Sequence, residues 1–599
     1  MASPNEPHTP SFPERLLIAL FKPLNALIPW HKLPTPLSVL NLAALRYELR
    51  SQNLYDTYPS PSYQGTPTTD PTPAEFQHTR NSDGLYNAIA QPKMGCAGMR
   101  FGRNVPREQT LRPSDEDILS PNPRIVSQEL LRRDEFKPAT ILNLLAAAWI
   151  HATEGFDVPV PEEDGWVGSG QGKEKKMWVE ATLADEPLDE TDRNAPAYKN
   201  LNTHWWDASQ IYGSSEARTK ELRGNAKNGK LAVDKQGFVT FLPRDANGIP
   251  ETGFMTNWWL GLEMLHTLFV LEHNAICEEL VKSYPQWGSE QVFDTARLVN
   301  CALMAKIHTV EWTPAILSHP ALQVGMSANW WGLMGEKLYK LLGRVTKGES
   351  ISGIPGSGAE QHGAPYSLTE EFVSVYRLHP LIPDDIAFFD AESGAHKKTY
   401  GIKDVAFENA RKPFNEQNLG FEDVLYSFGI NYPGAVTLNN TPDFLRDLHT
   451  PDGRHVDLGT IDILRDRERG VPRYNQFRRL FHMKPASSFV DLTGGNKEVA
   501  DRLEKVYEGD LEKVDLLVGC LCEPLPKGFG FSDTAFRVFI LMASRRLKSD
   551  RFIATEWNEK TYSKVGMAWV QNSGMKDVLT RHFPVLGETL KASKNRELP

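Results

Sequence analysis

The chain has 599 residues, of which 40% are hydrophobic and 24% are charged, and its formal net charge is −10. These values are ordinary for a globular protein that is long enough to bury a large core. The acidic balance and the lack of a long run of lysine and arginine argue against a nucleic-acid partner.

Cysteine usage indicates the redox compartment. The chain holds five cysteines, Cys96, Cys277, Cys301, Cys520 and Cys522. An odd and sparse set does not make a disulfide framework. We therefore expect an intracellular protein in a reducing compartment.

An apolar segment lies near the N-terminus, over Leu16–Trp30, and is interrupted by Lys22 and Pro23. It is shorter than the roughly 20 apolar residues that span a bilayer, and no small-residue cleavage site follows, so we expect no secretory signal. One interpretation is an amphipathic arm that touches a membrane or guards an apolar channel. The other is a helix packed on the core. We expect residues 1–55 to form this arm and residues 56–599 to form one domain.

Hydrophobic periodicity predicts a mainly α-helical chain with little β-structure. Apolar residues recur at helical spacing over Trp258–Leu280, Val292–Val310 and Thr534–Leu547. Alternation typical of a strand is scarce, as over Gly237–Leu242. The segments 56–80 and 345–366, which are rich in proline, glycine, serine or threonine, predict irregular structure.

Hard oxygen donors alternate in the segment THWWDASQIYGS. Thr203, Trp205, Asp207 and Ser209 occupy every second position. Calcium prefers carboxylate, hydroxyl and backbone carbonyl oxygens, so an extended loop with this pattern would suit that ion. A turn capped by Asp207 is the alternative interpretation.

The segment SLTEEFVSVYRLHPLIPDD, over Ser367–Asp385, carries the most chemical information. Ser367 and Glu370 predict a capping box that begins a helix, and the prolines that follow restrict its continuation. Tyr376 and His379 are three residues apart, so on a helix they share one face. An imidazole is a good axial ligand for haem iron, and a phenol beside a haem can be oxidised to a radical. From spacing alone, a purely structural role is the better interpretation, because tyrosine and histidine often share a helix face by chance.

Four segments of the chain resemble one family. EFVSVYRLHPLIPD is similar to the proximal-histidine helix of the cyclooxygenase branch of haem peroxidases, which includes prostaglandin synthases, linoleate diol synthases and plant-type fatty-acid α-dioxygenases. Trp259–Leu280, with its Glu-His-Asn triplet, Arg465–Arg479 and the loop Thr203–Ser214 also resemble this branch. The similarity runs from about Pro29 to Phe583 and favours the plant-type α-dioxygenases. It implies an animal-type haem peroxidase, cyclooxygenase-like fold.

The resemblance also implies roles for individual residues. Tyr376 matches the radical tyrosine and His379 the axial ligand of haem b. The calcium loop of the family matches Thr203, Trp205 through its backbone carbonyl, Asp207 and Ser209. In KIHTVEWTPAIL, His308 and Thr313 match residues that hold the substrate carboxylate. The segment SRRLKSDRF resembles the one that supplies a carboxylate-binding arginine, for which we expect Arg551, with Arg546 as the alternative.

The distal side of the haem site departs from the family. Ile141–Ile150 (ILNLLAAAWI) matches a helix that in the family continues with Gln, a few apolar residues and His-Asp-Trp. Here His151-Ala-Thr-Glu-Gly follows at once. Either a helical turn or two has been deleted, or His151 has moved into the distal role. We favour a deletion because the flanking segments match closely.

The function implied by the resemblance is the oxygenation of long-chain fatty acids at C2 to 2-hydroperoxy acids, through a tyrosyl radical formed after peroxide activates the haem. Fatty acid, O2 and peroxide would be its partners, and haem b and calcium its cofactors. We expect a soluble or peripherally membrane-associated enzyme. The first alternative is a mid-chain dioxygenase of the linoleate diol synthase type, although we expect no further C-terminal domain of the kind that many such enzymes carry. The second is a haem-binding relative inactivated by loss of the distal segment.

Overall fold

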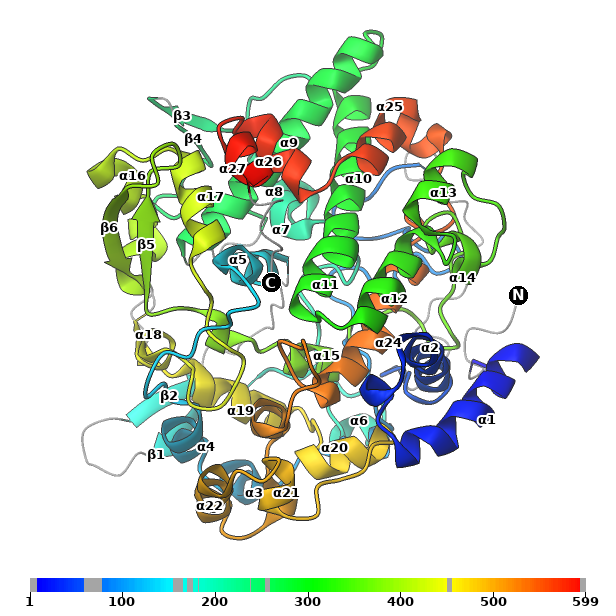
Figure 1. Cartoon of the computed structure of the whole chain (residues 1–599), viewed down its shortest axis with the longest axis vertical. Helices are drawn as coiled ribbons and strands as arrows, with labels where there is room; N and C mark the ends of the chain where they lie inside the picture. Colours follow the sequence, from blue (N-terminus) through cyan, green and yellow to red (C-terminus); the bar gives the residue numbers. More distant parts are fainter. Residues whose placement is uncertain are drawn as a thin grey trace.

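The computed structural model describes residues 8–58, 78–153, 165–169, 176–180, 182–237, 239–253, 259–449 and 455–592. Within these ranges the chain is mainly α-helical, and each sheet has two antiparallel strands (Figure 1). This confirms the predicted fold class. Most of the segment 56–80 and the residues 154–164 that follow the distal helix lie outside the described part.

The first third of the chain holds α1 Phe12–Leu27, α2 Thr35–Gln52, α3 Asp115–Leu119, α4 Pro123–Val126, α5 Leu144–Thr153, α6 Glu190–Asn194, α7 Ser209–Tyr212 and α8 Glu216–Arg223. The middle holds α9 Leu260–Ser283, α10 Ser289–Ile307, α11 Thr313–Ile316, α12 Pro320–Trp331, α13 Gly335–Leu342, α14 Glu349–Ser352, α15 Glu370–Val375, α16 Lys412–Gln417, α17 Phe421–Ile430 and α18 Asp443–Arg446. The last third holds α19 Leu458–Glu468, α20 Tyr474–Leu480, α21 Phe489–Leu492, α22 Lys497–Val506, α23 Leu516–Cys522, α24 Asp533–Ser549, α25 Glu559–Asn572, α26 Met575–His582 and α27 Leu586–Ala592. The strand pairs are β1 Gly165–Ser169 with β2 Lys176–Glu180, β3 Asp234–Gln236 with β4 Val239–Phe241, β5 Asp385–Phe389 with β6 His396–Gly401, and β7 Leu448–His449 with β8 His455–Val456.

The centre of the molecule is formed by α5, α9 and α10. Helix α9 packs against both α5 and α10, and α25 covers the other side of α10 (Figure 1). The three longest predicted helices are present as α9, α10 and α24, and the predicted strand segment contains β4. Periodicity identified these elements because their apolar faces are buried in one continuous core.

Helix α10 does not end as predicted. It passes at His308 into a π-helical turn, His308–Trp312, which leads directly into α11. Pro314 lacks the N–H that would continue the α-helical ladder, and the Thr313 N–H bonds instead to the carbonyl of His308, five residues earlier. Single π-turns within α-helices are frequent at functional sites, and this one presents His308 and Thr313.

The helix before His379 is shorter than predicted, and two details of the prediction were wrong. Its N-cap is Thr369, whose hydroxyl accepts from the N–H of Phe372, so Ser367 does not form the capping box. The helix ends at Val375, and His379 begins a separate 3-10 turn, His379–Leu381. The residue before a proline avoids helical backbone, and Pro380 directly follows His379. Tyr376 and His379 therefore do not share the face of one helix.

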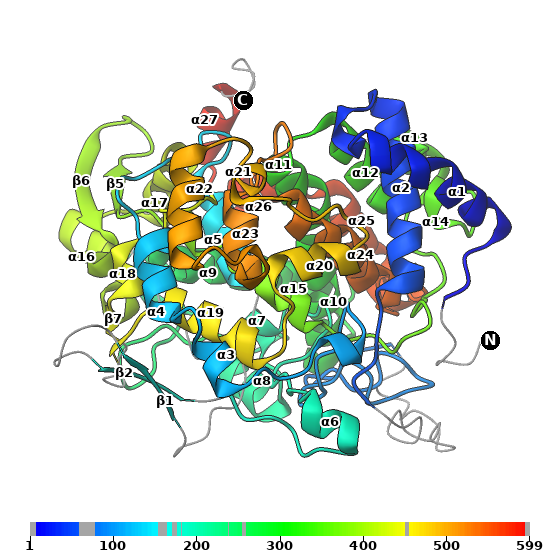
Figure 2. The same ribbon diagram turned by 90° about the horizontal axis from the view of Figure 1, so that it is seen from below.

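The N-terminal helices are packed onto the rest of the molecule. Helix α1 lies on α2, and α2 contacts α12 and α24 (Figure 2). Between them Trp30 is fully buried and donates from its indole N–H to Asp533 over 2.8 Å. None of the described helices is long and apolar enough to cross a membrane. All five cysteines are free, as expected from their number.

Candidate active site

His379 is held by a buried carboxylate. Its Nδ1 lies 2.8 Å from Oδ2 of Asp462 on α19, and the imidazole keeps 26% of its surface exposed. Asp462 also accepts from Arg377 over 2.5 Å. Because Nδ1 is engaged, Nε2 is the nitrogen that remains for a metal, and a carboxylate behind a ligating histidine fixes the ring and raises its basicity.

The charges around this pair favour an ionised Asp462. Burial opposes ionisation, but His379 and Arg377 outweigh it and lower the pKa of Asp462. Asp466, one turn further along α19, accepts from Ser374 and Arg377. Burial raises the pKa of Asp466 to about 6, although Arg377 opposes that rise. Asp462 was missed in the sequence, although it precedes the recognised Asp466 by four residues and so shares its helix face.

Tyr376 lies between aromatic rings that connect it to a cavity. Its ring packs on Phe372 at 4.4 Å and on Phe539 of α24 at 6.3 Å between centroids. In a segment that is otherwise largely buried, Tyr376 and His379 are both only half-buried. The phenol and the imidazole therefore both border open space, as a bound haem with an adjacent radical tyrosine would require.

A cavity lies next to Phe539, whose ring packs on Tyr376, and its empty volume of about 460 Å³ includes space open to solvent. It is lined mainly by apolar side chains of α12 and α24 and by α2, together with Trp206, His308 and Thr313. Phe539 lines this cavity and also packs on Tyr376. The shape and lining suit an apolar ligand with one polar end.

His308 is a neutral hydrogen-bond donor toward this cavity. Burial and the nearby Arg546 lower its pKa well below the usual value. The indole N–H of Trp149 donates to Nδ1 over 3.0 Å. An indole only donates, so Nδ1 carries no proton and the proton lies on Nε2. The Trp312 ring stacks on the imidazole at 4.7 Å and fixes its plane. Trp149 carried no signal in the sequence beyond its place in an apolar run.

The two candidate arginines lie in different surroundings. The guanidinium of Arg546 covers the ring of Trp206 at 4.4 Å and lies 5.7 Å from that of Phe372. Trp206 in turn contacts the His308 ring at 4.7 Å, and Phe372 packs on Tyr376. Arg546 is therefore linked to His308 through Trp206, which lines the cavity, and to Tyr376 through Phe372.

Arg551, our choice from the sequence, points elsewhere. Its guanidinium donates to the backbone carbonyls of Asn87 and Tyr86 and lies 3.7 Å from Glu556. None of these residues lines the cavity. Both arginines belong to the matched segment SRRLKSDRF, and only the packing of α24 distinguishes them.

His151 lies in the last turn of α5, and its ring is 6.1 Å from that of Trp259. Burial lowers its pKa to about 3, with a further contribution from His379. A base with so low a pKa accepts protons poorly at neutral pH.

The predicted calcium loop is compact and buried. The hydroxyl of Thr203 donates to Oδ2 of Asp207 over 2.6 Å, and the N–H of Ser209 donates to Oδ1 over 3.1 Å. The Trp205 ring stacks on Tyr366 at 4.5 Å. The hydrogen bonds of Asp207 are those of the capped turn that was the alternative to a calcium site.

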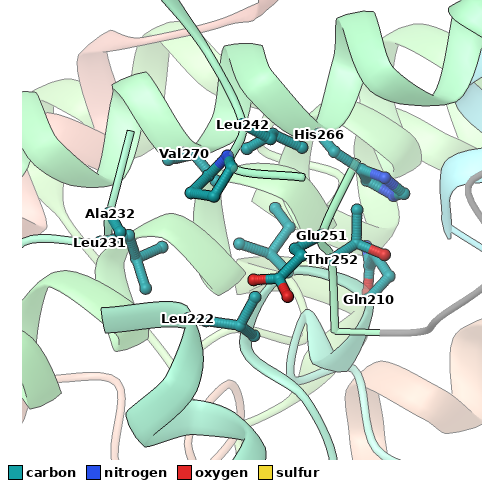
Figure 3. A pocket seen from close by; sticks show the side chains of 11 residues that line it. Gln210, Leu222, Leu231, Ala232, Leu242, Glu251, Thr252, His266 and Val270 are labelled. Carbon is teal, nitrogen blue, oxygen red and sulfur yellow. The ribbon is translucent and has the colours of Figure 1, made fainter. Parts of the chain in front are cut away.

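A second cavity, of about 320 Å³, begins one residue beyond this loop at Gln210 (Figure 3). Leucines from α8 and the segments around it form one wall, while Glu251, Thr252 and His266 contribute polar groups (Figure 3). It contains none of the site residues predicted from the sequence.

Comparison with known proteins agrees with this geometry. Residues 79–594 match the family model described as animal haem peroxidase, and the chain belongs to this family. It is therefore a haem-dependent enzyme, of the dioxygenase and peroxidase class.

Among its relatives, the chain is 37% identical to "Alpha-dioxygenase PIOX" of Oryza sativa subsp. japonica over 94% of this chain and 92% of that protein. It is 38% identical to "Alpha-dioxygenase 2" of Arabidopsis thaliana over 93% of this chain and 88% of that protein. The crystal structure of an Oryza sativa fatty acid alpha-dioxygenase, a Tyr-to-Phe variant with palmitic acid, superposes with a TM-score of 0.87 at 34% identity and covers 97% and 96% of the two chains. The resemblance to plant-type α-dioxygenases is confirmed.

If His379 is the axial ligand that the resemblance implies, replacing it with alanine should abolish the Soret band of the purified protein, because the iron would lose its axial nitrogen. The measurement is haem content and absorbance after reconstitution. His396→Ala is a matched control, since His396 is exposed and contacts Thr399 on the same strand. Haem content equal to that of the control would refute the role of His379.

Proposed function

We propose that the enzyme oxygenates long-chain fatty acids at C2 and that Arg546, rather than Arg551, binds their carboxylate. The observation that supports this most directly is that His308 and Thr313 line one apolar cavity whose wall residue Trp206 contacts Arg546 and whose wall residue Phe539 contacts Tyr376. If the polar end of the cavity holds the substrate carboxylate close to Tyr376, then C2 is the chain carbon that lies nearest to the phenol. The palmitic acid in the rice relative supports a fatty-acid substrate.

The polar side chains at this end of the cavity would attract the substrate carboxylate and orient it. Arg546 contributes a permanent positive charge, and charge-assisted hydrogen bonds to a carboxylate are strong. Nε2–H of His308 adds a neutral donor held by Trp149. The hydroxyl of Thr313 donates to the carbonyl of His308 over 2.8 Å and turns toward a carboxylate oxygen when substrate binds.

His379 would hold the haem, and the bound haem would supply a one-electron oxidant for Tyr376. Tyr376 then loses its phenolic hydrogen and, as a radical, takes one hydrogen atom from C2 of the substrate. O2 adds to the carbon radical, and the peroxyl radical recovers the hydrogen atom from Tyr376. The product is the 2-hydroperoxy acid, and the tyrosyl radical is regenerated. The rings of Phe372 and Phe539 hold Tyr376 in place during these transfers.

Arg546→Ala should weaken the use of free fatty acids. Loss of a charge-assisted contact in a dry cavity costs about 1.5–3 kcal/mol, which corresponds to roughly 10- to 150-fold in kcat/KM. The methyl ester, which lacks the charge, should be affected far less. Arg551→Ala is the matched control and should leave the ratio of acid to ester turnover unchanged. Equal losses for acid and ester in Arg546→Ala would contradict the assignment, as would a selective loss of acid turnover in Arg551→Ala.

We also propose that the loop around Asp207 binds calcium through Thr203, Asp207, Ser209 and the carbonyl of Trp205. The support is that side-chain oxygens of Thr203 and Asp207 already lie 2.6 Å apart in a buried loop. A hard cation there would replace the hydroxyl proton as the partner of the carboxylate.

The N-terminal arm, residues 1–55, is proposed to touch a lipid surface. Helix α1 exposes Phe12, Leu16, Leu20 and Leu27 at spacings that form one face. An exposed apolar stripe on a surface helix is typical of interfacial helices. The helix α2 on which α1 lies also lines the cavity through Arg46.

Leu16→Ser with Leu20→Ser should lower partitioning into phospholipid vesicles at least about 10-fold, because each buried leucine contributes about 1.5–3 kcal/mol. Co-sedimentation with vesicles measures this effect. Leu338→Ser with Leu341→Ser, on the exposed side of α13, serves as a control for a general loss of surface hydrophobicity. An equal loss of vesicle binding in both variants would show that α1 does not contribute specifically to membrane binding.

A further inference from the structure

A small hairpin far along the chain gathers three metal-ligand side chains. Strands β7 and β8 pair antiparallel, with His449 directly opposite His455. Directly paired residues project from the same face of a two-stranded sheet, with Cβ atoms about 4.5–5.5 Å apart. Asp447 ends α18 directly before β7, two residues before His449. All three side chains are exposed, so an ion can reach them from solvent.

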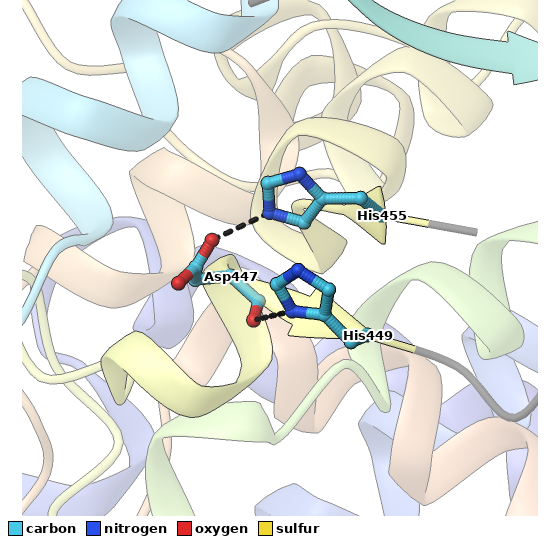
Figure 4. A group of neighbouring side chains, drawn as sticks. All are labelled: Asp447, His449 and His455. Atoms are coloured by element: carbon cyan, nitrogen blue, oxygen red, sulfur yellow. Dashed lines mark hydrogen bonds and ion pairs between the residues drawn. The ribbon is translucent and has the colours of Figure 1, made fainter. Parts of the chain in front are cut away.

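The side chains converge as the pairing requires. The two imidazole rings stack at 4.3 Å between centroids, with planes 16° apart. Asp447 lies beside both: its carboxylate accepts from Nε2 of His455, and its backbone carbonyl lies 3.3 Å from Nδ1 of His449 (Figure 4). One ligand atom from each residue lies within 4.8 Å of the others. Of the described residues, this is the one group of three or more His, Cys, Asp or Glu side chains that is close enough to hold an ion.

We propose that Asp447, His449 and His455 bind a divalent late transition-metal ion such as Zn²⁺. Zinc–nitrogen and zinc–oxygen bonds are about 2.0–2.2 Å long, so ligand atoms around one ion are about 3–4 Å apart and small side-chain rotations suffice. Two imidazoles with one carboxylate suit zinc, copper or nickel, whereas calcium and magnesium prefer sites built from oxygen. The remaining coordination positions are open to water.

The ion would replace a proton between two of its ligands. In the structure the contact between His455 and Asp447 is a hydrogen bond. A metal bound to Nε2 of His455 and to the same carboxylate would displace the proton from Nε2 and keep the two side chains together.

The hairpin lies directly before α19, so an ion bound to it would affect how that helix is held. Asp457, two residues after His455, is the N-cap of α19 and accepts from the N–H of Thr460. Helix α19 carries Asp462, which holds His379. An ion that ties β7 to β8 therefore fixes the chain immediately before the helix that supports the proximal histidine. The zinc site itself is separate from the active site and does not depend on the proposed reaction.

The test is zinc titration of the full-length, haem-loaded protein by calorimetry, with His449→Ala/His455→Ala, Asp447→Asn and His396→Ala as variants. We expect the His396 variant to bind zinc as the unmodified protein does. The double variant should lose one equivalent of zinc, and Asp447→Asn should bind that equivalent at least about 10-fold more weakly. Millimolar calcium should not displace the ion. An unchanged Soret band in each variant shows that the fold is intact.

Two results would overturn the proposal. One is the same zinc stoichiometry and affinity in the double variant as in His396→Ala. The other is displacement of the ion by calcium, which would show an oxygen-ligand site elsewhere. Copper offers a second readout, because Cu²⁺ bound here should show coupling to two imidazole nitrogens in its paramagnetic resonance spectrum, and that coupling should vanish in the double variant.

Discussion

Tyr376→Phe should leave haem binding unchanged and abolish fatty-acid oxygenation. Phenylalanine keeps the ring that packs on Phe372 and Phe539, so the fold and the cavity should be preserved. It removes the phenolic O–H, and without that group no radical can form at this position to take hydrogen from the substrate. Oxygen uptake should fall to the rate of the uncatalysed background.

The measurement is oxygen consumption at equal haem loading, with peroxidase activity toward a small phenol recorded in parallel. That second activity should survive in Tyr376→Phe, because it does not need the tyrosyl radical. Tyr400→Phe is a matched control on β6, where the hydroxyl contacts Glu416 at the protein surface, and it should oxygenate fatty acids normally. Normal oxygenation by Tyr376→Phe would disprove the radical role.

Inserting a family-type segment with Gln and His-Asp-Trp after Ile150 should raise both peroxidase and dioxygenase turnover by about 10²–10⁴-fold, the usual contribution of a positioned general acid–base. His151 is a poor substitute, because burial and His379 lower its pKa to about 3. A weak base deprotonates peroxide inefficiently. Both activities should rise together, because haem activation precedes the tyrosyl radical.

The comparison requires the unaltered chain, the chain with the insertion and His151→Ala, all at equal haem loading. Calcium affinity should also rise on insertion, since the added aspartate supplies a second carboxylate beside Asp207. Full activity of the unaltered chain together with loss of activity in His151→Ala would contradict the deletion and identify His151 as the distal residue.

Much of the fold followed from periodicity. Helices α9, α10 and α24 bury long apolar faces, and the apolar residues of these faces recur at helical spacing in the sequence. The segment around Tyr376 and His379 was found from its residues, but the local geometry was not: Thr369 rather than Ser367 caps the helix, and Pro380 separates the histidine into its own turn. Ser367 and Thr369 are both possible N-caps, and tertiary packing, which cannot be read from the sequence, decides between them.

The site itself could be predicted only in part. His308 and Thr313 follow from the matched segment, but the π-turn that presents them was not predicted, because periodicity gave one uninterrupted helix there. The choice between Arg546 and Arg551 depends on tertiary packing: Arg546, in the last turn of α24, meets Trp206 and Phe372, whereas Arg551 follows the end of the helix and contacts Asn87 and Tyr86. The hairpin of Asp447, His449 and His455 was not found either, because cross-strand pairing joins residues whose spacing in sequence carries no motif.

The central claim is attack at C2, and oxygen consumption with palmitic acid followed by mass spectrometry of the product tests it most directly. A saturated acid lacks the bis-allylic hydrogens that mid-chain oxygenation uses. The unaltered chain and the chain with the restored distal segment should both give the 2-hydroperoxy acid, because the position of attack is set by the carboxylate site and not by the rate of haem activation. Oxygen uptake with linoleic acid but none with palmitic acid, or a product oxygenated in mid-chain, would contradict the account.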